Sequence, residues 1–246
     1  MNQASAQARK AALVFGGSRG IGAAIVDRLA TDGFAVAFTY VSSADKAKTL
    51  VDRIAEQGGQ ALAIQADSAD PAAIRNAVAQ AVERFGDIDV TVVNAGVFRM
   101  GTIDAVSLED LDLMLNVNVR GVYLSIQATV PHLKPGARVI TIGSNVALHT
   151  RTPGASVYQL TKTALAGMVK GVALDLAPRG ITVNNIQPGP TETDMTAGAL
   201  DMLAGMNPLK RVAKPGEIAG LVAYLAGDEA GYVTGASLTI DGGFTL

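Results

Sequence analysis

Residues 11–22, AALVFGGSRGIG, decide the fold of this chain. The five apolar residues that end at Phe15 predict a buried strand, and a helical pattern of apolar residues follows the loop. Glycines in such a loop permit a tight turn and the close approach of a pyrophosphate, which the unpaired N–H groups of the helix N-terminus bind. The spacing of Gly16, Gly20 and Gly22 differs from the more widespread dinucleotide fingerprint, in which one residue separates the first two glycines. The stretch therefore predicts a dinucleotide-binding loop, with a purely structural turn as the alternative.

The rest of the chain alternates short apolar runs with longer segments of helical period, which predicts parallel strands joined by crossover helices. Most strand candidates are apolar throughout, as in a sheet that is buried on both faces. We expect one α/β domain over 1–246, a Rossmann-type doubly wound parallel sheet of about seven strands with helices on both faces. The expected strands are 11–15, 35–40, 61–65, 90–94, 138–142, 182–186 and 238–241. The expected helices are 21–31, 44–57, 71–85, 108–129, 157–176 and 215–226.

Two segments fall outside this alternation. Residues 1–10 are polar and rich in Ala and Gln, and we expect a flexible tail there. Residues 193–211 are less regular and place Met195, Met202 and Met206 among small residues. This segment is either a mobile cap over a pocket or an ordinary packed helical insertion.

Composition narrows the classes of function. The net charge is −2 with both signs interspersed, which argues against nucleic acid as a partner. The chain has no cysteine, so disulfides, a thiolate nucleophile and cysteine-ligated zinc are excluded, and only His132 and His149 offer imidazole. We expect no metal site. The start of the chain does not read as a signal peptide and no apolar run is long enough to cross a bilayer, so we expect a soluble cytoplasmic protein.

Tyr158 and Lys162 stand four residues apart in the expected helix 157–176 and therefore project from one face. A tyrosine phenol has a pKa near about 10, so it exchanges protons at neutral pH only where a cation stabilises the phenolate. Lys162 is placed to be that cation, with an amphipathic surface pair as the alternative. A serine, Ser144, lies just beyond the expected strand 138–142.

Together these features resemble the short-chain dehydrogenase/reductase family over nearly the whole chain, and within it the 3-oxoacyl-acyl-carrier-protein reductases. Two positions depart from the family pattern. Phe15 stands where a threonine usually ties the loop to its neighbours, which puts the rigidity of the loop in doubt, and Val93 replaces an asparagine. The matching positions are Gly16, Gly20, Gly22, Asn94, Ala95, Gly96, Asn118, Ser144, Tyr158, Lys162, Pro188, Gly189, Thr193 and the stretch 240–243.

The resemblance implies reversible hydride transfer between a nicotinamide and a carbonyl or secondary alcohol carbon. Tyr158 would deliver or remove the proton, and Lys162 would lower the phenol pKa and hold the nicotinamide ribose. Ser144 would hydrogen-bond the reacting oxygen, and Asn118 would hold a water that links Lys162 to solvent. The resemblance also implies a homotetramer assembled through long helices and the C-terminal segment. Residues 117–130 and 157–176 are rich in small and apolar residues on more than one face, as expected of helices buried on both sides. Such helices would otherwise pack within one subunit.

The expected cofactor is NADP, with NAD possible. The expected second strand ends Phe38-Thr39-Tyr40-Val41-Ser42-Ser43, without the carboxylate that usually accepts hydrogen bonds from the ribose of NAD. Arg19 is placed to recognise a phosphate there, with a solvated loop charge as the alternative, whereas Lys46 is read as a solvated helix residue. Asp67 is expected to contact the adenine or, alternatively, to cap a helix, a role that Ser68 or Asp70 fits better. The expected cofactor contacts are Gly16, Ser18, Arg19, Gly20, Ile21, Gly22, Tyr40, Ser42, Asp67, Ser68, Asn94, Ala95, Gly96, Tyr158, Lys162, Pro188, Gly189, Thr191 and Thr193.

The substrate is less defined. His149 and Arg151 lie between Ser144 and Tyr158, where they either select the substrate or face solvent, and His132 is expected to be structural. Abundant Ala, Val and Met favour an apolar carbonyl compound, but small ketones, cyclic alcohols, steroids and acyl thioesters all stay open. A second interpretation is a nucleotide sensor, because the glycine loop also resembles that of cyclic-di-GMP-binding biofilm-dispersal proteins on this fold.

Overall fold

The computed structural model describes residues 9–151 and 153–246, which form a seven-stranded parallel sheet in the order β3-β2-β1-β4-β5-β6-β7. The expected doubly wound fold is confirmed, while the expected tail falls mostly on residues 1–8, outside the described residues. The strands are β1 (Ala11–Phe15), β2 (Ala35–Tyr40), β3 (Gln60–Gln65), β4 (Ile88–Val93), β5 (Leu133–Ile142), β6 (Thr182–Pro188) and β7 (Ser237–Ile240).

The strand order reverses at β1. The chain runs from β1 outward through β2 to β3, and then returns to place β4 on the opposite side of β1. At such a reversal the loops after the two central strands diverge, and this opens a crevice at the carboxyl ends of the strands where ligands bind. The topology thus puts the glycine-rich loop after β1 and the residues after β4 at one crevice.

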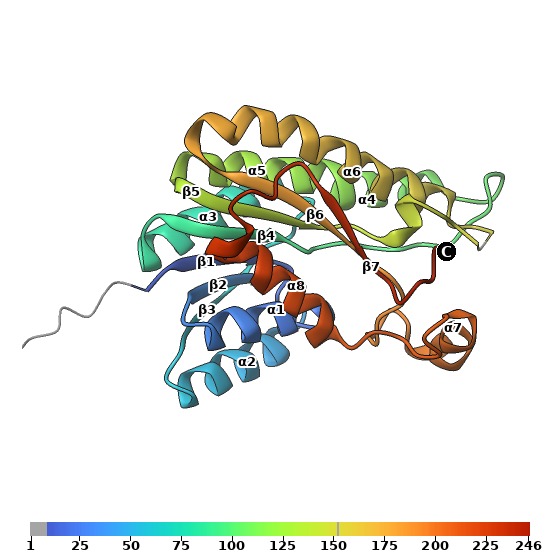
Figure 1. Ribbon diagram of the computed structural model, residues 1–246, viewed down its shortest axis with the longest axis horizontal. Helices are drawn as coiled ribbons and strands as arrows, with labels where there is room; N and C mark the ends of the chain where they lie inside the picture. Colours follow the sequence, from blue (N-terminus) through green and yellow to red (C-terminus); the bar gives the residue numbers. More distant parts are fainter. Residues whose placement is uncertain (1–8, 152) are drawn as a thin grey trace, which may run out of the picture.

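Helices cover both faces of the sheet (Figure 1). Helices α1, α2 and α8 lie on one face, and α3, α4, α5 and α6 lie on the other. Their bounds are α1 (Gly20–Thr31), α2 (Ala44–Glu56), α3 (Pro71–Phe85), α4 (Leu108–Leu115), α5 (Val122–Thr129), α6 (Ser156–Leu176), α7 (Leu200–Met206) and α8 (Pro215–Ala226).

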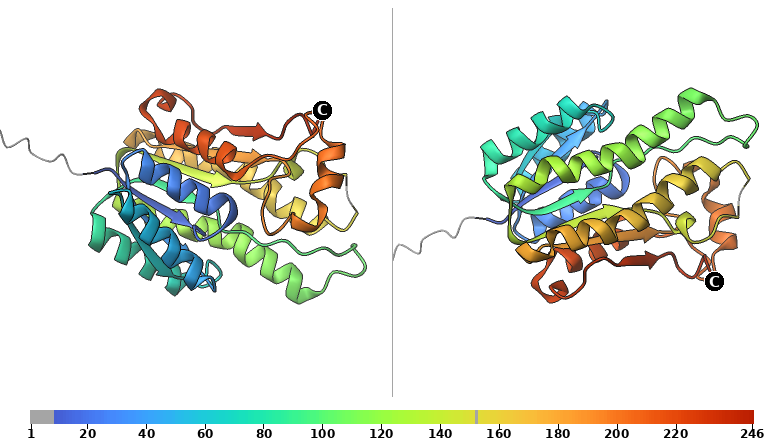
Figure 2. Two further views of the ribbon diagram at one scale, coloured as in Figure 1. Left: turned by 90° about the horizontal axis from the view of Figure 1, so that it is seen from below. Right: turned by 90° about the horizontal axis from the view of Figure 1, so that it is seen from above.

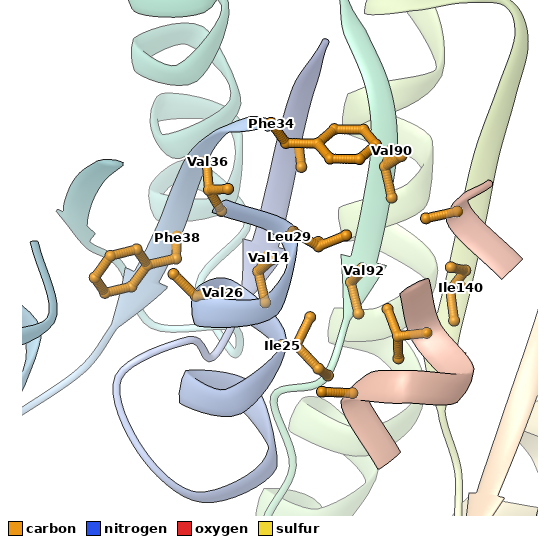
Figure 3. Close-up of a cluster of buried hydrophobic side chains, with 14 of the residues drawn as sticks. Val14, Ile25, Val26, Leu29, Phe34, Val36, Phe38, Val90, Val92 and Ile140 are labelled. Carbon is orange, nitrogen blue, oxygen red and sulfur yellow. The ribbon is translucent and has the colours of Figure 1, made fainter. Parts of the chain in front are cut away.

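Alternate residues of each central strand enter two separate cores. In β1, Val14 packs into the core under α1 and α8, while Leu13 and Phe15 pack into the core under α3, α5 and α6. Figure 3 shows part of the first core, where Val14 and Val92 of neighbouring strands lie against Ile25 of α1. A strand that is buried on both faces has to be apolar at successive positions, which explains the run at 11–15.

The expected helix 108–129 is wrong as a single α-helix. It divides into α4, a π-helical stretch Asn116–Gly121, and α5. Smaller differences concern strand ends: β4 spans Ile88–Val93 instead of 90–94, and β5 begins at Leu133, five residues before the expected start at 138. The expected ends of 35–40, 71–85 and 215–226 agree with the structure.

The irregular segment 193–211 contains a short 3₁₀ turn, Ala197–Ala199, followed by α7. Figure 2 shows that α7 lies at the same end of the molecule as the end of the chain. The far end of α7 is fixed, because the buried Asn207 side chain donates a hydrogen bond to the carbonyl of Asp241 over 2.9 Å. Met202 on α7 is exposed. Throughout the described part of the chain, every helix is too short or too polar to cross a membrane.

Candidate active site

A cavity of about 770 Å³ opens at the carboxyl ends of β1, β2 and β4. Thirteen of the expected cofactor contacts line this cavity: Gly16, Ser18, Arg19, Gly20, Ile21, Tyr40, Ser42, Asp67, Ser68, Asn94, Ala95, Gly96 and Thr193. The expected contacts that do not line it are Gly22, Tyr158, Lys162, Pro188, Gly189 and Thr191. The structure therefore brings these thirteen residues together at one cavity, and their contacts with a cofactor stay a prediction.

The glycine-rich loop closes on itself so tightly that side chains are excluded. A Cβ atom on Gly22 would lie 2.0 Å from the carbonyl oxygen of Gly16, and Gly16 itself has a φ of 79°. Asn94, directly after β4, donates from Nδ2 to the same Gly16 carbonyl over 2.7 Å. Gly22 thus acts by making room for the loop, and the bare loop backbone leaves space at the start of α1 that a dinucleotide fits.

Thr39 supplies the hydroxyl that Phe15 cannot. The Gly16 N–H donates to Thr39 Oγ1 over 2.9 Å, and the Gly17 N–H donates to the Thr39 carbonyl over 2.8 Å. Phe15 is buried in the core under α3, α5 and α6. The doubt about loop rigidity is therefore resolved by a residue on the neighbouring strand, which the sequence alone did not identify.

Asp67 and Asp70, which follow β3, have different roles in the structure: one caps a helix and the other lines the cavity. Asp70 is the N-cap of α3, since its carboxylate accepts a hydrogen bond from the Ala72 N–H over 2.7 Å. Asp67 accepts from the Ala69 N–H over 2.9 Å, is exposed, and lines the cavity. Asp67 consequently remains available for a ligand, and the helix-cap alternative for it is wrong.

Lys162 is buried, so the alternative of an amphipathic surface pair is wrong. Its side chain on α6 donates from Nζ to the Ile142 carbonyl over 2.9 Å, and only 4% of the residue is exposed. The Nζ atom lies 5.6 Å from the centroid of the Tyr158 ring. A Cβ on Gly96 would lie 3.6 Å from Nζ, so the loop after β4 passes directly beside the cation.

Burial sets the proton affinities of this pair. It raises the pKa of Tyr158 to about 12, and the hydrogen bond with Ser144 acts in the opposite direction. Burial also lowers the pKa of Lys162 to about 8, because the charged ammonium loses its hydration. The expected lowering of the phenol pKa is thus reversed in this structure, where desolvation outweighs the stabilisation of the phenolate.

Asn118 lies in the π-helical stretch with its side chain fully engaged. Its Oδ1 accepts from the Val97 N–H over 2.8 Å, and its Nδ2 donates to the Val97 carbonyl over 2.8 Å and to Thr161 over 3.2 Å. Close packing at Gly121, where a Cβ would lie 2.2 Å from the Ser68 carbonyl oxygen, brings this stretch against the loop after β3. The side chain therefore holds the loop after β4, and the expected water stays a prediction.

An aromatic ring that the sequence did not single out joins the cavity to the tyrosine. Phe98 lines the cavity, and its ring meets that of Tyr158 edge-on, with centroids 4.8 Å apart. Val97 and Met195 also line the cavity. Only the packing of the loop after β4 against α6 reveals Phe98, because a lone aromatic residue in a loop carries no sequence signal.

The substrate-loop candidates lie elsewhere. Arg151 donates to the Leu246 carbonyl over 3.0 Å and its guanidinium lies 5.4 Å from the Phe244 ring centroid, while His149 is exposed; neither lines the cavity. His132 lines a second cavity, of about 380 Å³, together with residues of α3 and α5. Within 9–151 and 153–246, no three His, Asp or Glu side chains are grouped as a metal site would need.

Comparisons with known proteins agree with this geometry. A family model described as enoyl-(acyl carrier protein) reductase matches residues 16–245. The cyclic-di-GMP-binding biofilm dispersal mediator protein of Escherichia coli is 43% identical over 96% of this chain and 97% of its own length. A 3-oxoacyl-[acyl-carrier-protein] reductase of Staphylococcus aureus is 37% identical over 96% and 98%.

Solved structures are similar throughout. A short-chain dehydrogenase/reductase from Serratia marcescens is 54% identical, with a TM-score of 0.94 over 96% of this chain and 98% of that one. A short-chain dehydrogenase from Burkholderia cenocepacia, solved in complex with NADP, is 48% identical, with a TM-score of 0.94 over 98% and 100%.

The role of Thr39 is testable by Thr39→Val, which keeps the side-chain shape and removes the hydroxyl. The Gly16 N–H would lose its partner, so we expect the free energy of unfolding to fall by about 1–3 kcal/mol in urea titrations. Thr49→Val, in the exposed part of α2, is the control and should change stability by less than about 0.5 kcal/mol. Equal stability of the two variants would contradict the role of Thr39 in fixing the loop.

Proposed function

We propose that this chain, which belongs to the short-chain dehydrogenase/reductase family, is an NADPH-dependent oxidoreductase that reversibly reduces a ketone or 3-oxoacyl group to a secondary alcohol. The resemblance to 3-oxoacyl-acyl-carrier-protein reductases is confirmed. The observation that carries the proposal is the buried Lys162 beside Tyr158. The two side chains lie against Gly96 and Phe98, which line the same cavity as the glycine-rich loop. Membership of the family alone would not distinguish an enzyme from a protein that only binds nucleotide.

NADP is the preferred cofactor. Residues Tyr40 to Ser43 at the end of β2 line the cavity and offer no carboxylate to the ribose, while Arg19 offers a guanidinium at the same cavity. A relative of 48% identity was solved with NADP, which supports the same preference here. Asp67 would contact the adenine end, and Asn94 and Thr193 would line the path toward the nicotinamide.

When bound, the cofactor supplies the hydride, and the protein supplies position and proton transfer. Tyr158 gives its phenolic proton to the carbonyl oxygen as the alcohol forms, and takes it back in the reverse direction. Ser144 hydrogen-bonds the same oxygen and so orients the carbonyl. Lys162 stabilises the phenolate that remains and holds the nicotinamide ribose. The ring of Phe98, which lies against that of Tyr158, favours an apolar carbonyl compound.

A second candidate function is a nucleotide sensor that binds cyclic-di-GMP. It is favoured by the 43% identity to a biofilm dispersal mediator protein described as binding that nucleotide. The buried lysine and tyrosine give a sensor no evident advantage, so we place the enzyme first. Cyclic-di-GMP binding, together with the absence of NADPH oxidation across a broad carbonyl panel, would reverse this order.

We further propose that the chain is one domain and assembles as a homotetramer through α5, α6 and their neighbours. Both helices carry exposed apolar side chains besides their buried faces, at Tyr123, Leu160 and Leu174. Sedimentation velocity at micromolar concentration should give the mass of four chains. A profile of monomers alone at that concentration would contradict the assembly.

The enzymatic proposal is tested by following NADPH oxidation at 340 nm against ketones, diketones and acetoacetyl thioesters. We expect rapid oxidation with one class, and Tyr158→Phe should lower turnover by about 10²–10⁴-fold because the proton donor is lost. Affinity for NADPH, measured by fluorescence titration, should stay within about threefold, since the ring is retained. Tyr232→Phe, at a fully exposed position outside α5 and α6, is the matched control and should retain full activity. Unchanged turnover in Tyr158→Phe would refute the role.

The pKa directions predict how carbonyl reduction depends on pH. The phenol, with its pKa raised to about 12, keeps its proton across the working range, whereas Lys162, with its pKa lowered to about 8, loses its charge first. We therefore expect kcat/KM for reduction to be highest below pH 8 and to fall as the pH rises through that value. NADPH affinity measured at the same pH values separates weaker binding from slower proton delivery. A profile that is flat up to about pH 10 would contradict the assignment to Lys162.

A further inference from the structure

Three charged side chains from distant parts of the chain converge at the rim of the cavity. Asp194, which follows β6, accepts from Arg19 of the glycine-rich loop over 3.4 Å and from Lys46 in the first turn of α2 over 3.2 Å. Both contacts use the same carboxylate oxygen, Oδ2. The pairing of this carboxylate lowers its pKa, and Lys46 is the larger cause. The reading of Lys46 as a purely solvated helix residue is therefore incomplete.

The position of this cluster matters more than its strength. All three side chains are more than half exposed, so each ion pair is weak in solution. Arg19 and Asp194 nevertheless line the cavity, beside Ser42 and Ser43 at the end of β2. Two cations thus meet a single carboxylate at the rim of the cavity, and the end of β2, near which the ribose of a dinucleotide is recognised in this type of fold, lines the same cavity.

We propose that Asp194 is a specificity-determining residue that competes with the 2′-phosphate of the cofactor for Arg19 and Lys46. This inference rests on the proposed use of NADPH. A phosphate carries more negative charge and more acceptor oxygens than a carboxylate, so it displaces Asp194 from the two cations. NADH carries no such group and leaves the cluster intact. Asp194 therefore lowers the affinity for NADPH and leaves that for NADH unaltered.

The displacement of Asp194 by the 2′-phosphate also affects the chain segment 193–195, which leads to α7. Asp194 is preceded by Thr193, whose methyl group would lie 3.2 Å from a Cβ on Gly20, and is followed by Met195, which lines the cavity. Release of Asp194 removes the ionic contacts that hold this segment to α2 and the glycine-rich loop. The 2′-phosphate thus acts on the segment that leads to α7.

The test compares Asp194→Asn and Lys46→Gln with the unaltered protein by calorimetric titration of NADPH, NADH, 2′,5′-ADP and 5′-AMP. Asp194→Asn should increase the affinity for NADPH and for 2′,5′-ADP by about two- to tenfold, which is the range expected for one or two exposed ion pairs. The affinities for NADH and 5′-AMP should stay unchanged. Lys46→Gln should weaken the binding of the two ligands that carry a 2′-phosphate, NADPH and 2′,5′-ADP, by a similar factor. Asp52→Asn, which removes a carboxylate paired with Lys48 on the same helix, controls for net charge and should change none of the four affinities.

Equal shifts for ligands with and without the 2′-phosphate, or weaker NADPH binding in Asp194→Asn, would overturn the competition and leave Asp194 as a residue that only positions its segment. Unchanged affinities in both variants would overturn it as well. If the unaltered protein binds neither NADPH nor NADH, the proposed function fails instead, so the two failures are distinguishable.

Discussion

The close contact between Gly16 and Gly22 constrains the shape of the glycine-rich loop that follows β1, and the site is arranged around this loop. No side chain fits between these residues, because a Cβ on Gly22 would lie 2.0 Å from the Gly16 carbonyl oxygen. That carbonyl is held by Asn94 from β4, and the Gly16 N–H is held by Thr39 from β2. The loop is consequently fixed from both strands that flank β1. A central strand with two parallel neighbours is what allows a loop without side chains to keep one shape.

The burial of Lys162 is the second constraint, and it opposes stability. An ammonium group loses hydration when it enters the protein, and this lowers its pKa to about 8. The Ile142 carbonyl offsets only part of that loss through one hydrogen bond. A partly satisfied buried charge next to a tyrosine is understandable as a functional feature, since a packed core alone would favour an apolar side chain at this position.

The sequence predicted those features that depend on short-range pattern. The ends of β1 and β2 agree with the structure because apolar runs bounded by Gly and Ser are local signals. The division of 108–129 at Asn116–Gly121 was missed, because the contacts that accompany it, such as those of Asn118 with Val97, are made with a distant loop. An apolar helical period carries no information about such contacts.

The contacts of Thr39, Lys46 and Asp194 were missed for the same reason, since each joins segments that are distant along the chain. Thr39 reaches Gly16 only because β1 and β2 pair in parallel with Ala11 beside Ala35. The sequence of either strand alone does not predict this pairing register. Asp194 and Lys46 are separated by 148 residues along the chain. The sequence pattern of its own helix therefore predicted that Lys46 is exposed, but it could not predict the ion pair with a residue from the segment after β6.

The loop that follows β4 connects the two halves of the site. Asn94 at its start holds the glycine-rich loop, and Val97 is bonded through both backbone groups to Asn118. Phe98 then lies against the ring of Tyr158. The loop after β4 therefore contacts both the glycine-rich loop and Tyr158, the residue that we propose as the proton donor. Because the sheet order reverses at β1 and β4 is its parallel neighbour, the fold brings the loops after β1 and β4 together at one crevice.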